Sequence, residues 1–480
     1  MEEAKKKVLN EDWLALYIGL AIFILGLGAF LGVNVLGWGI KTSVWIDAGK
    51  AMSAVSPAFK DMSGSTALFL TYLFILFFML VAARYLDIAV GKFAAAFTAV
   101  FWISYLCWFC GHYAYIAATP DVVGKYGISW SLKLTGEAGF IVALAAGLVI
   151  SNFFPRLAEA LSAAARPELF IKTAIVILGA GLGAKAAESL SLASAILFRG
   201  MCASIEVYLV DWAVVYLVAR TVFKFNREWA APLASGISIC GVSAAIATGA
   251  AIRARPVVPI MVSSLVVIFA VVELIILPFI AQAMLWHQPM VAGDWMGLAV
   301  KTDGAAVASG AIVDALVRAK AFAMEGVRYQ EGWILMPATT SKIFIDFFIG
   351  IWAFVLAVIW CTKIECKSEV RAAEIWERFP KFVLGYFLTF LLMLAVSMSS
   401  PDALKAAKAA TSQMDAFRVL FFVMTFFTIG LISNFKKLWD EGIGKLAAVY
   451  LLCLFGFIVW VGLLISYIFF HGIKPPLVAG

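Results

Sequence analysis

Residues 234–251 read ASGISICGVSAAIATGAA, a stretch with no Leu, Phe or Trp in a chain that is 64% hydrophobic. Its glycines weaken a helix, and its serine and threonine hydroxyls can satisfy backbone groups where a helix unwinds. We therefore predict a broken helix here. The alternative is close packing of two helices on small residues. That packing needs small residues on one face only, whereas this stretch is small on nearly all faces.

The composition of the whole chain indicates whether the protein lies in water or in a lipid bilayer. The chain has 480 residues, a mean hydropathy of +0.98 and only 14% charged residues. This leaves too little polar surface to cover a soluble globule of this size. Apolar runs near or above the roughly 20 residues that cross a bilayer recur along the chain. The composition therefore predicts an all-α polytopic membrane protein in a lipid bilayer.

We expect roughly 11–13 transmembrane helices, with inverted repeats and with broken helices near the midplane of the membrane. Residues 1–137 are predicted to form an N-terminal transmembrane extension, and residues 138–480 a transporter core. The stretches 229–252 and 297–317 either cross the membrane or re-enter it. The predicted spans are 13–36, 64–83, 92–118, 138–154, 169–184, 192–222, 229–252, 257–285, 297–317, 334–361, 379–398, 418–434 and 446–469.

The basic residues between these spans indicate an orientation. Most of them fall on one side if each predicted span crosses once, which places the N-terminus in the cytoplasm and the C-terminus outside. Arg253, Arg255, Arg318, Lys320 and Arg328 are the exceptions. The net charge of +7 follows from this bias, so it does not point to nucleic acid.

Two segments suggest an internal repeat. Residues 172–190 read KTAIVILGAGLGAKAAESL, and residues 423–438 read VMTFFTIGLISNFKKL. Each runs from an apolar helix into Gly-Leu, then a basic residue, then Leu. The two segments cross in opposite directions in the predicted topology, as an inverted-topology transporter repeat requires.

The break in 234–251 predicts a substrate site. The N-terminus of a half-helix presents free backbone N–H groups and positive partial charge, which suits an anion without a buried Arg or Lys. The stretch contains no carboxylate. We predict that Ser238, Cys240, Gly241 and Ser243 bind a small anion.

A second stretch, KTDGAAVASGAI at 301–312, also consists mainly of small and hydroxyl-bearing residues, and it contains the charged residues Lys301 and Asp303. An ionisable residue inside a membrane segment is a functional candidate. Asp303 is predicted to carry the coupling proton or sodium ion. Thr302 and Ser309 are predicted to bind the substrate through their hydroxyl oxygens. The alternative is that Lys301 and Asp303 pair locally at an interface.

A third group lies in PATTSKIFIDFF at 337–348. Lys342 and Asp346 are four residues apart, so they share a helix face and could neutralise each other. Alternatively, Lys342 meets a substrate anion, and it is therefore a candidate substrate-binding residue. Glu206, Asp211 and Glu273 also lie in apolar runs, as relay or structural carboxylates.

Cofactor and metal chemistry are not expected. The stretch CWFC at 107–110 is followed by Gly111 and His112, which leaves one residue too many for a haem-attachment motif. The three histidines are far apart, and the sequence has neither a P-loop nor a dinucleotide fingerprint. We expect no enzyme activity, no cofactor and no bound metal.

The run from Gly236 to Ala244 resembles a known family. The YeiH-type sulfate exporter family of conserved hypothetical bacterial membrane proteins carries Gly-x-Ser-Ile-Cys-Gly-x-Ser-Ala, which this run matches. Family members also carry Leu-Gly-x-x-Leu, similar to Leu178–Leu182, and a late Gly-Leu helix like that at Gly430. The resemblance covers about 138–470. It implies a bacterial inner-membrane carrier of the broad class that includes cation–proton antiporters and bile-acid symporters, a class in which homodimers are common.

The sequence therefore predicts a secondary active transporter of a small anion, most simply sulfate, sulfite or an organic sulfonate, coupled to protons or sodium. A cation–proton antiporter is the first alternative, in which carboxylates alone bind the transported ions. A membrane-embedded enzyme or a non-transporting subunit is the second.

Overall fold

The computed structural model describes residues 10–118, 122–132, 134–255, 257–364, 376, 379–434 and 444–478. The regular secondary structure of these residues is helical apart from one two-stranded sheet, which confirms the predicted all-α class. Nine helices among them are long and apolar enough to cross a membrane. A tenth span results if the helices at 138–153 and 155–164, bent by 118°, are taken together.

The predicted spans 229–252, 297–317 and 379–398 account for the rest of the predicted number. The first is interrupted and forms two helices of 12 and 10 residues. The second is interrupted after residue 299 and continues in a helix of 23 residues, and the third is a helix of 17 residues. Interruption at membrane depth is tolerated where the freed backbone groups find partners in the protein.

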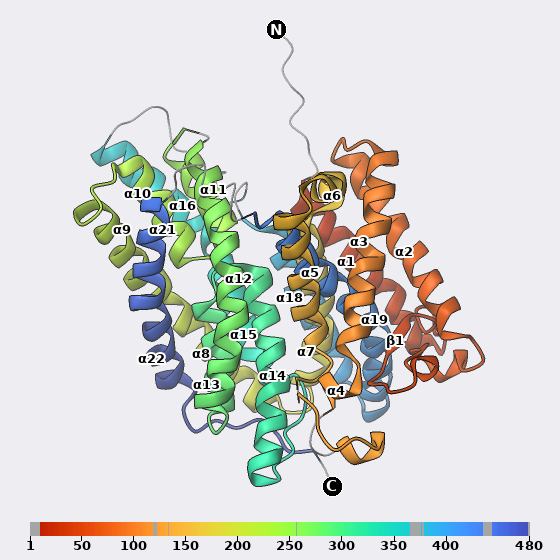
Figure 1. Cartoon of the computed structure of the whole chain (residues 1–480). Coiled ribbons are helices and arrows are strands. Elements are labelled where there is room, and N and C mark those ends of the chain that lie inside the picture. The colour runs from red at the N-terminus through yellow and green to blue at the C-terminus, as the bar shows by residue number, and fades with distance from the viewer. Residues whose placement is uncertain are drawn as a thin grey trace. The chain divides into compact units, whose positions relative to one another are not determined.

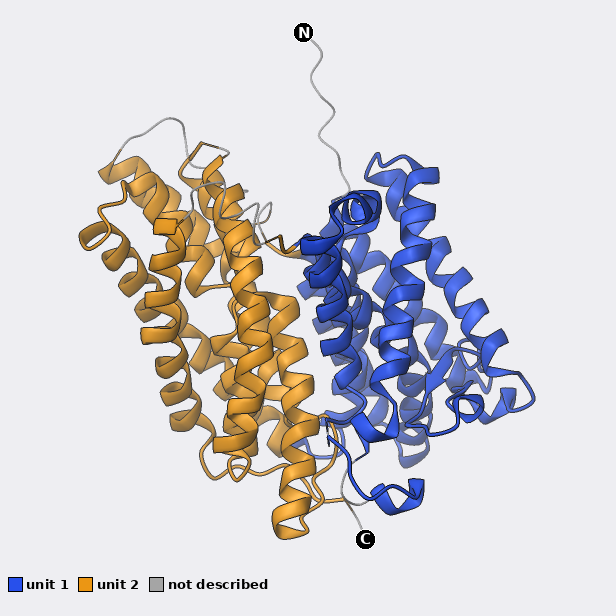
Figure 2. Cartoon of the chain, in the orientation of Figure 1, with its two compact units in different colours: residues 1–190, 381–432 blue, residues 191–380, 433–480 orange. Residues whose placement is uncertain are grey.

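The chain forms two compact units, each built from segments distant in sequence (Figure 2). Unit 1 comprises residues 1–190 and 381–432, and unit 2 comprises residues 191–380 and 433–480. Unit 1 thus joins the predicted extension to parts of the predicted core. The predicted boundary at residue 137, between the N-terminal extension and the transporter core, stays a prediction.

Unit 1 contains nine of the described α-helices and the small sheet (Figure 1). In β1 and β2, Ile40 pairs with Ala54 and Thr42 with Met52 in antiparallel register. The elements are α1 (Glu11–Gly26), β1 (Ile40–Thr42), β2 (Met52–Ala54), α2 (Gly64–Tyr85), α3 (Val90–Gly111), α4 (Ala114–Ala117), α5 (Ala138–Phe153), α6 (Pro155–Leu161), α7 (Pro167–Ala186), α18 (Lys381–Ser397) and α19 (Pro401–Ile432), with short 3₁₀ turns at 27–31, 48–50, 57–59, 123–126 and 162–164.

Helix α7 forms the core of unit 1, packed against α1, α18 and α19. Its glycines explain how closely α18 approaches. A Cβ at Gly179 would lie 2.5 Å from the carbonyl oxygen of Tyr386, and a Cβ at Gly183 would lie 2.2 Å from that of Phe390. The same holds between α5 and α19, where a Cβ at Gly430 would lie 2.3 Å from the oxygen of Leu144. Gly179 and Gly183, which flank the Gly-Leu pair of α7, and Gly430 of α19 therefore serve close helix packing.

Unit 2 contains the remaining helices. They are α8 (Leu190–Glu206), α9 (Trp212–Thr221), α10 (Arg227–Ser238), α11 (Val242–Ala251), α12 (Val257–Leu285), α13 (Pro289–Ala299), α14 (Asp303–Glu325), α15 (Leu335–Phe347), α16 (Ile349–Lys363), α21 (Gly444–Cys453) and α22 (Val459–Phe470), with single π-helical turns at Val207–Asp211 and Leu454–Ile458.

Helix α13 lies at the centre of unit 2, because every one of its residues is buried. It packs against α12, α14, α15 and α22. The π-helical turn at Val207–Asp211 interrupts the long helix formed by α8 and α9, and such turns are frequent at functional sites. The buried charged groups described next surround α13.

Candidate functional site

The first helix break lies where the sequence predicts it. Helix α10 ends at Ser238, and α11 begins at Val242. Gly241 between them has a φ of +74° and a ψ of −108°, a backbone conformation that is essentially open only to glycine. The small-residue stretch is therefore an interrupted helix, as predicted.

A second break separates α13 from α14. Helix α13 ends at Ala299, Val300 is extended, and Asp303 opens α14. The hydroxyl of Thr302 caps α14 by accepting a hydrogen bond from the N–H of Ala305 at 3.2 Å. The predicted span 297–317 is thus not one helix, because its first residues belong to α13 and the break follows at once.

The two breaks lie against each other. A Cβ at Gly241 would lie 2.9 Å from the main-chain oxygen of Lys301 and 3.2 Å from the side chain of Thr302. Only glycine allows this approach. We refer to residues 238–241 and 298–303 together as the paired breaks.

Lys301 connects the paired breaks through its ammonium group. Its Nζ donates a hydrogen bond to the carbonyl of Ser238 in the first break, at 3.2 Å. It donates another to the carbonyl of Leu298 in the second break, at 2.5 Å. The same Nζ lies 3.7 Å from a carboxylate oxygen of Asp211, which ends the π-helical turn. The Lys301 side chain is fully buried.

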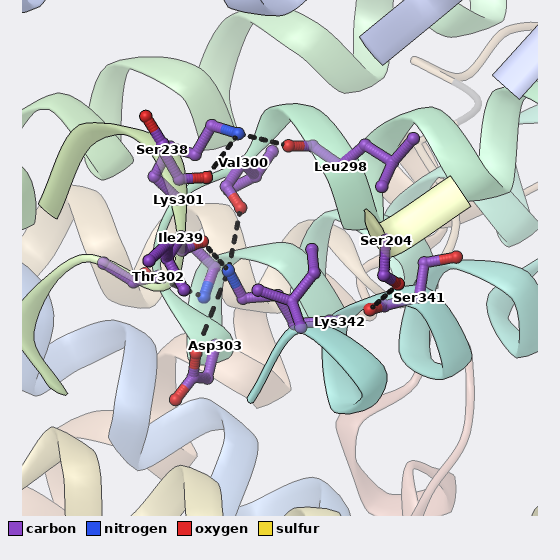
Figure 3. Close-up of polar contacts among 12 residues, drawn as sticks. Ser204, Ser238, Ile239, Leu298, Val300, Lys301, Thr302, Asp303, Ser341 and Lys342 are labelled. Atoms are coloured by element: carbon purple, nitrogen blue, oxygen red, sulfur yellow. Dashed lines mark hydrogen bonds and ion pairs between the residues drawn. The ribbon is translucent and has the colours of Figure 1, made fainter. Parts of the chain in front are cut away.

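Lys342 of α15 connects the same two breaks in the same way (Figure 3). Its Nζ donates to the carbonyl of Ile239 at 3.0 Å and to that of Val300 at 3.5 Å. It lies 3.9 Å from a carboxylate oxygen of Asp303. Each lysine therefore contacts one carbonyl from each break and one carboxylate.

These contacts explain why two ammonium groups can be buried in this unit. An ammonium group without partners is very costly to remove from water. The carbonyl oxygens at the C-terminal end of a helix carry a negative partial charge and lack partners within the helix. The two lysines satisfy such oxygens in α10 and α13 and place positive charge where the helix dipole favours it.

Further carboxylates surround the paired breaks. Glu273 of α12 accepts a hydrogen bond from the backbone N–H of Lys301 at 2.8 Å and from the hydroxyl of Tyr450 at 3.1 Å. Asp294 of α13 accepts hydrogen bonds from the hydroxyls of Ser341 and Ser466, the second at 2.7 Å. Both carboxylates are fully buried.

Cys240, Asp303 and Asp346 form a compact group beside Lys342. One ligand atom from each of the three lies within 4.8 Å of the others, and all three side chains are buried. The group offers a thiol and two carboxylates. It is the arrangement closest to a cation site that the described residues contain.

The structure brings together most of the predicted site residues. Ser238, Cys240, Gly241, Thr302, Asp303 and Lys342 belong to the paired breaks or contact them. Ser243 lies in the first turn of α11 and is half-buried. Ser309 lies further along α14, where its hydroxyl is buried without a hydrogen-bond partner among the described residues.

Sequence reasoning missed two features of the site. The sequence suggests local pairing of Lys301, whereas its side chain reaches Asp211 and both breaks. Asp294 lies outside the predicted span, which begins at residue 297. The signal was present in PMVAGDWMGLA, where a single carboxylate stands in an apolar run.

The fold and the site define a polytopic helical membrane protein with two interrupted helices joined by buried lysines. A family model described as conserved hypothetical protein 698 matches residues 113–449, more than half of the chain. A UPF0324 membrane protein of Nitrosomonas europaea is 42% identical over 473 residues, which cover 97% of both chains. The chain belongs to this family of UPF0324 membrane proteins.

Two other relatives differ in coverage. An uncharacterized protein of Archaeoglobus fulgidus is 50% identical over 165 residues, which cover 30% of this chain and 88% of the relative. A UPF0324 membrane protein of Rhodopirellula baltica is 28% identical over 373 residues, which cover 76% of this chain and 60% of the relative. No solved structure matches the chain.

Proposed function

We propose that the protein is a secondary active transporter of a small anion, with sulfate, sulfite or an organic sulfonate as the leading class, coupled to an ion gradient. The observation that carries this proposal is the pair of buried lysines that join two helix breaks in unit 2. Interrupted helices and ionisable side chains inside a membrane protein mark substrate and ion pathways.

The N-terminus of α11 is the part of the paired breaks best suited to an anion. Its N-cap, Gly241, makes no side-chain hydrogen bond, and the first turn contains no acidic residue. Helix α14 differs, because Thr302 caps it and Asp303 occupies its first position. The N–H groups at this helix end and the helix dipole therefore favour an anion at α11, beside the hydroxyl of Ser243.

The lysines support the same assignment. Their ammonium groups are bound to the carbonyl oxygens of the half-helices, which are the groups that a bare cation would use. When the carboxylates paired with them are protonated, the two ammonium groups favour an anion in the buried site. The hydroxyl of Ser238 is buried without a hydrogen-bond partner among the described residues, so it can donate to such an anion.

The cation–proton antiporter remains a second candidate because of the acidic side chains. Asp211, Glu273, Asp294, Asp303 and Asp346 are all buried in unit 2 near the two lysines. A net negative charge is costly in a buried site, so protons or other cations would neutralise the excess. In the anion carrier these carboxylates hold the coupling ion, with Asp303 as the first candidate. In the antiporter they hold the transported cation.

We further propose a cell-membrane location in bacteria, with a cytoplasmic N-terminus, an external C-terminus and a homodimeric assembly. The basic residues between the predicted spans support the orientation. We propose no enzymatic activity, no cofactor and no nucleic-acid partner.

Uptake by proteoliposomes tests the proposal. Purified full-length protein should exchange or accumulate labelled sulfate, sulfite or a simple sulfonate above the level of protein-free liposomes. A pH or sodium gradient should drive the accumulation. If none of these anions moves while sodium–proton exchange proceeds without them, the antiporter replaces the anion carrier.

A further inference from the structure

The two ammonium groups in unit 2 have equivalent surroundings. Lys301 contacts Ser238 and Leu298 through their carbonyls and Asp211 through its carboxylate. Lys342 contacts the carbonyls of Ile239 and Val300, and the carboxylate of Asp303. In each case one carbonyl comes from the first break, one comes from the second, and the carboxylate comes from a buried residue.

Carbonyl oxygens at helix breaks together with a carboxylate are the ligands that transporters use for monovalent cations. An ammonium group carries the same charge as a sodium ion. Here it is attached to the chain, so it cannot leave with the transported ions. A sodium ion can take either set of oxygens only by displacing a lysine.

We propose that Lys301 and Lys342 are built-in replacements for monovalent cations, so that the coupling ion of this protein is the proton and not sodium. A consequence is that neutralising Lys342 creates a sodium site from the oxygens of Ile239, Val300 and Asp303. The coupling part rests on the transport function proposed above, whereas the creation of a sodium site does not depend on it.

The protons would move at the lysine–carboxylate pairs. A proton taken up from water converts the carboxylate of Asp303 or Asp211 to the acid, and its release to water restores the carboxylate. The net charge of each pair then changes between zero and plus one, with no other reactant. The groups that face Lys342 are Cys240, Asp303, Asp346, Glu273 and Lys301, and those that face Lys301 are Asp211, Glu206, Glu273 and Lys342.

Cys240 and Asp346 make the position of Lys342 the better one for the test. Both lie with Asp303 in one buried group, so a cation that replaces the ammonium meets a second carboxylate. A glutamine at position 342 also keeps an oxygen near the site. Lys342→Gln should therefore bind sodium. Lys342→Arg should not, because it retains the positive charge.

Thermal unfolding of the purified full-length protein tests the inference in sodium chloride, potassium chloride and choline chloride at equal concentration. The melting temperature of the unsubstituted protein should be the same in sodium as in choline. That of Lys342→Gln should rise in sodium by roughly 2 °C or more, since a ligand that binds the native state stabilises it. Lys320→Gln is the matched control, because Lys320 lies on α14 outside the paired breaks and donates an exposed hydrogen bond to the carbonyl of Ala283.

Sodium-specific stabilisation of the unsubstituted protein would overturn the inference, as would a folded Lys342→Gln protein that responds equally to the three salts. If Lys342→Gln does not fold, proteoliposomes decide the question. A pH gradient should drive anion uptake by the unsubstituted protein, and a sodium gradient without a pH gradient should not. Uptake driven by sodium alone refutes the inference but keeps the transporter. Absence of any anion movement refutes the proposed function, and the comparison of sodium with choline for the unsubstituted protein still tests whether sodium binds.

Discussion

Gly241 faces the main-chain oxygen of Lys301 so closely that a Cβ at position 241 would lie 2.9 Å from it. The same Cβ would lie 2.6 Å from a methyl group of Val266 on α12. The two helix breaks therefore approach each other only because position 241 has no side chain. Its positive φ adds a second reason for glycine.

Gly241→Ala should consequently destabilise the protein. The backbone conformation alone costs a residue with a Cβ on the order of 1–3 kcal/mol, and the close contacts add to it. We expect a clear fall in melting temperature. Gly181→Ala on α7 is the control, because a Cβ there meets nothing within 4 Å and alanine favours a helix. Equal melting temperatures for the two variants would mean that the paired breaks are not held as described.

The buried pair of Lys301 and Asp211 leads to a second prediction. Lys301→Met leaves the Asp211 carboxylate without its cation and two carbonyls without a donor. Breaking a buried pair by removing one partner typically costs about 3–5 kcal/mol. The double variant Lys301→Met with Asp211→Asn removes both charges, so its melting temperature should lie above that of Lys301→Met alone.

The exposed pair of Lys405 and Asp402 is the control for that comparison. Its side chains are 81% and 94% exposed, and such pairs contribute little to stability. The corresponding single and double substitutions should leave the melting temperature nearly unchanged. Purely additive losses for Lys301 and Asp211 would show that their charges are not coupled.

The part of the site that sequence predicts is the part encoded locally. The break at 239–241 follows from glycine and from hydroxyl-bearing residues in one continuous stretch, and the structure confirms it. The second break is preceded by apolar residues, and the sequence therefore predicts one continuous span, 297–317, across it. No local pattern marks Val300 as its first extended residue.

The lysine contacts depend on tertiary structure. Lys342 lies more than 100 residues from Ile239 in sequence, and its carbonyl partners carry no side-chain signal at all. The pairing of Lys342 with Asp303 therefore does not follow from the spacing of Lys342 and Asp346, which suggests a pair on one helix face. In the same way, the composition of units 1 and 2 from separate segments follows only from the folded chain.

Asp303 provides a third prediction, which concerns coupling. If its carboxylate carries the coupling ion, Asp303→Asn should abolish the dependence of anion uptake on an imposed pH gradient. Exchange of labelled for unlabelled anion should persist, because exchange needs no net ion movement. Asp402→Asn is the control, since Asp402 is an exposed residue. Gradient-driven uptake at the unsubstituted level would exclude Asp303 and direct attention to Asp211 and Glu273.

The last prediction tests whether the anion binds at the N-terminus of α11. Ser243 lies in the first turn of that helix and is half-buried, so its hydroxyl can donate to a ligand at the helix end. A hydrogen bond to a charged group contributes about 1.5–3 kcal/mol, so Ser243→Ala should weaken anion binding by about tenfold or more. Ser243→Asp should weaken it further, because its carboxylate would itself interact with the positive end of the helix. Competition of unlabelled sulfate against labelled substrate in proteoliposomes measures both effects. Ser264→Ala is the control, since Ser264 is exposed on α12 and its hydroxyl donates to the carbonyl of Ile260 in the same helix. If Ser243→Asp transports the anion with unchanged affinity, the substrate does not bind at this helix end. Anion binding would then depend on the lysines at the paired breaks and not on the N-terminus of α11.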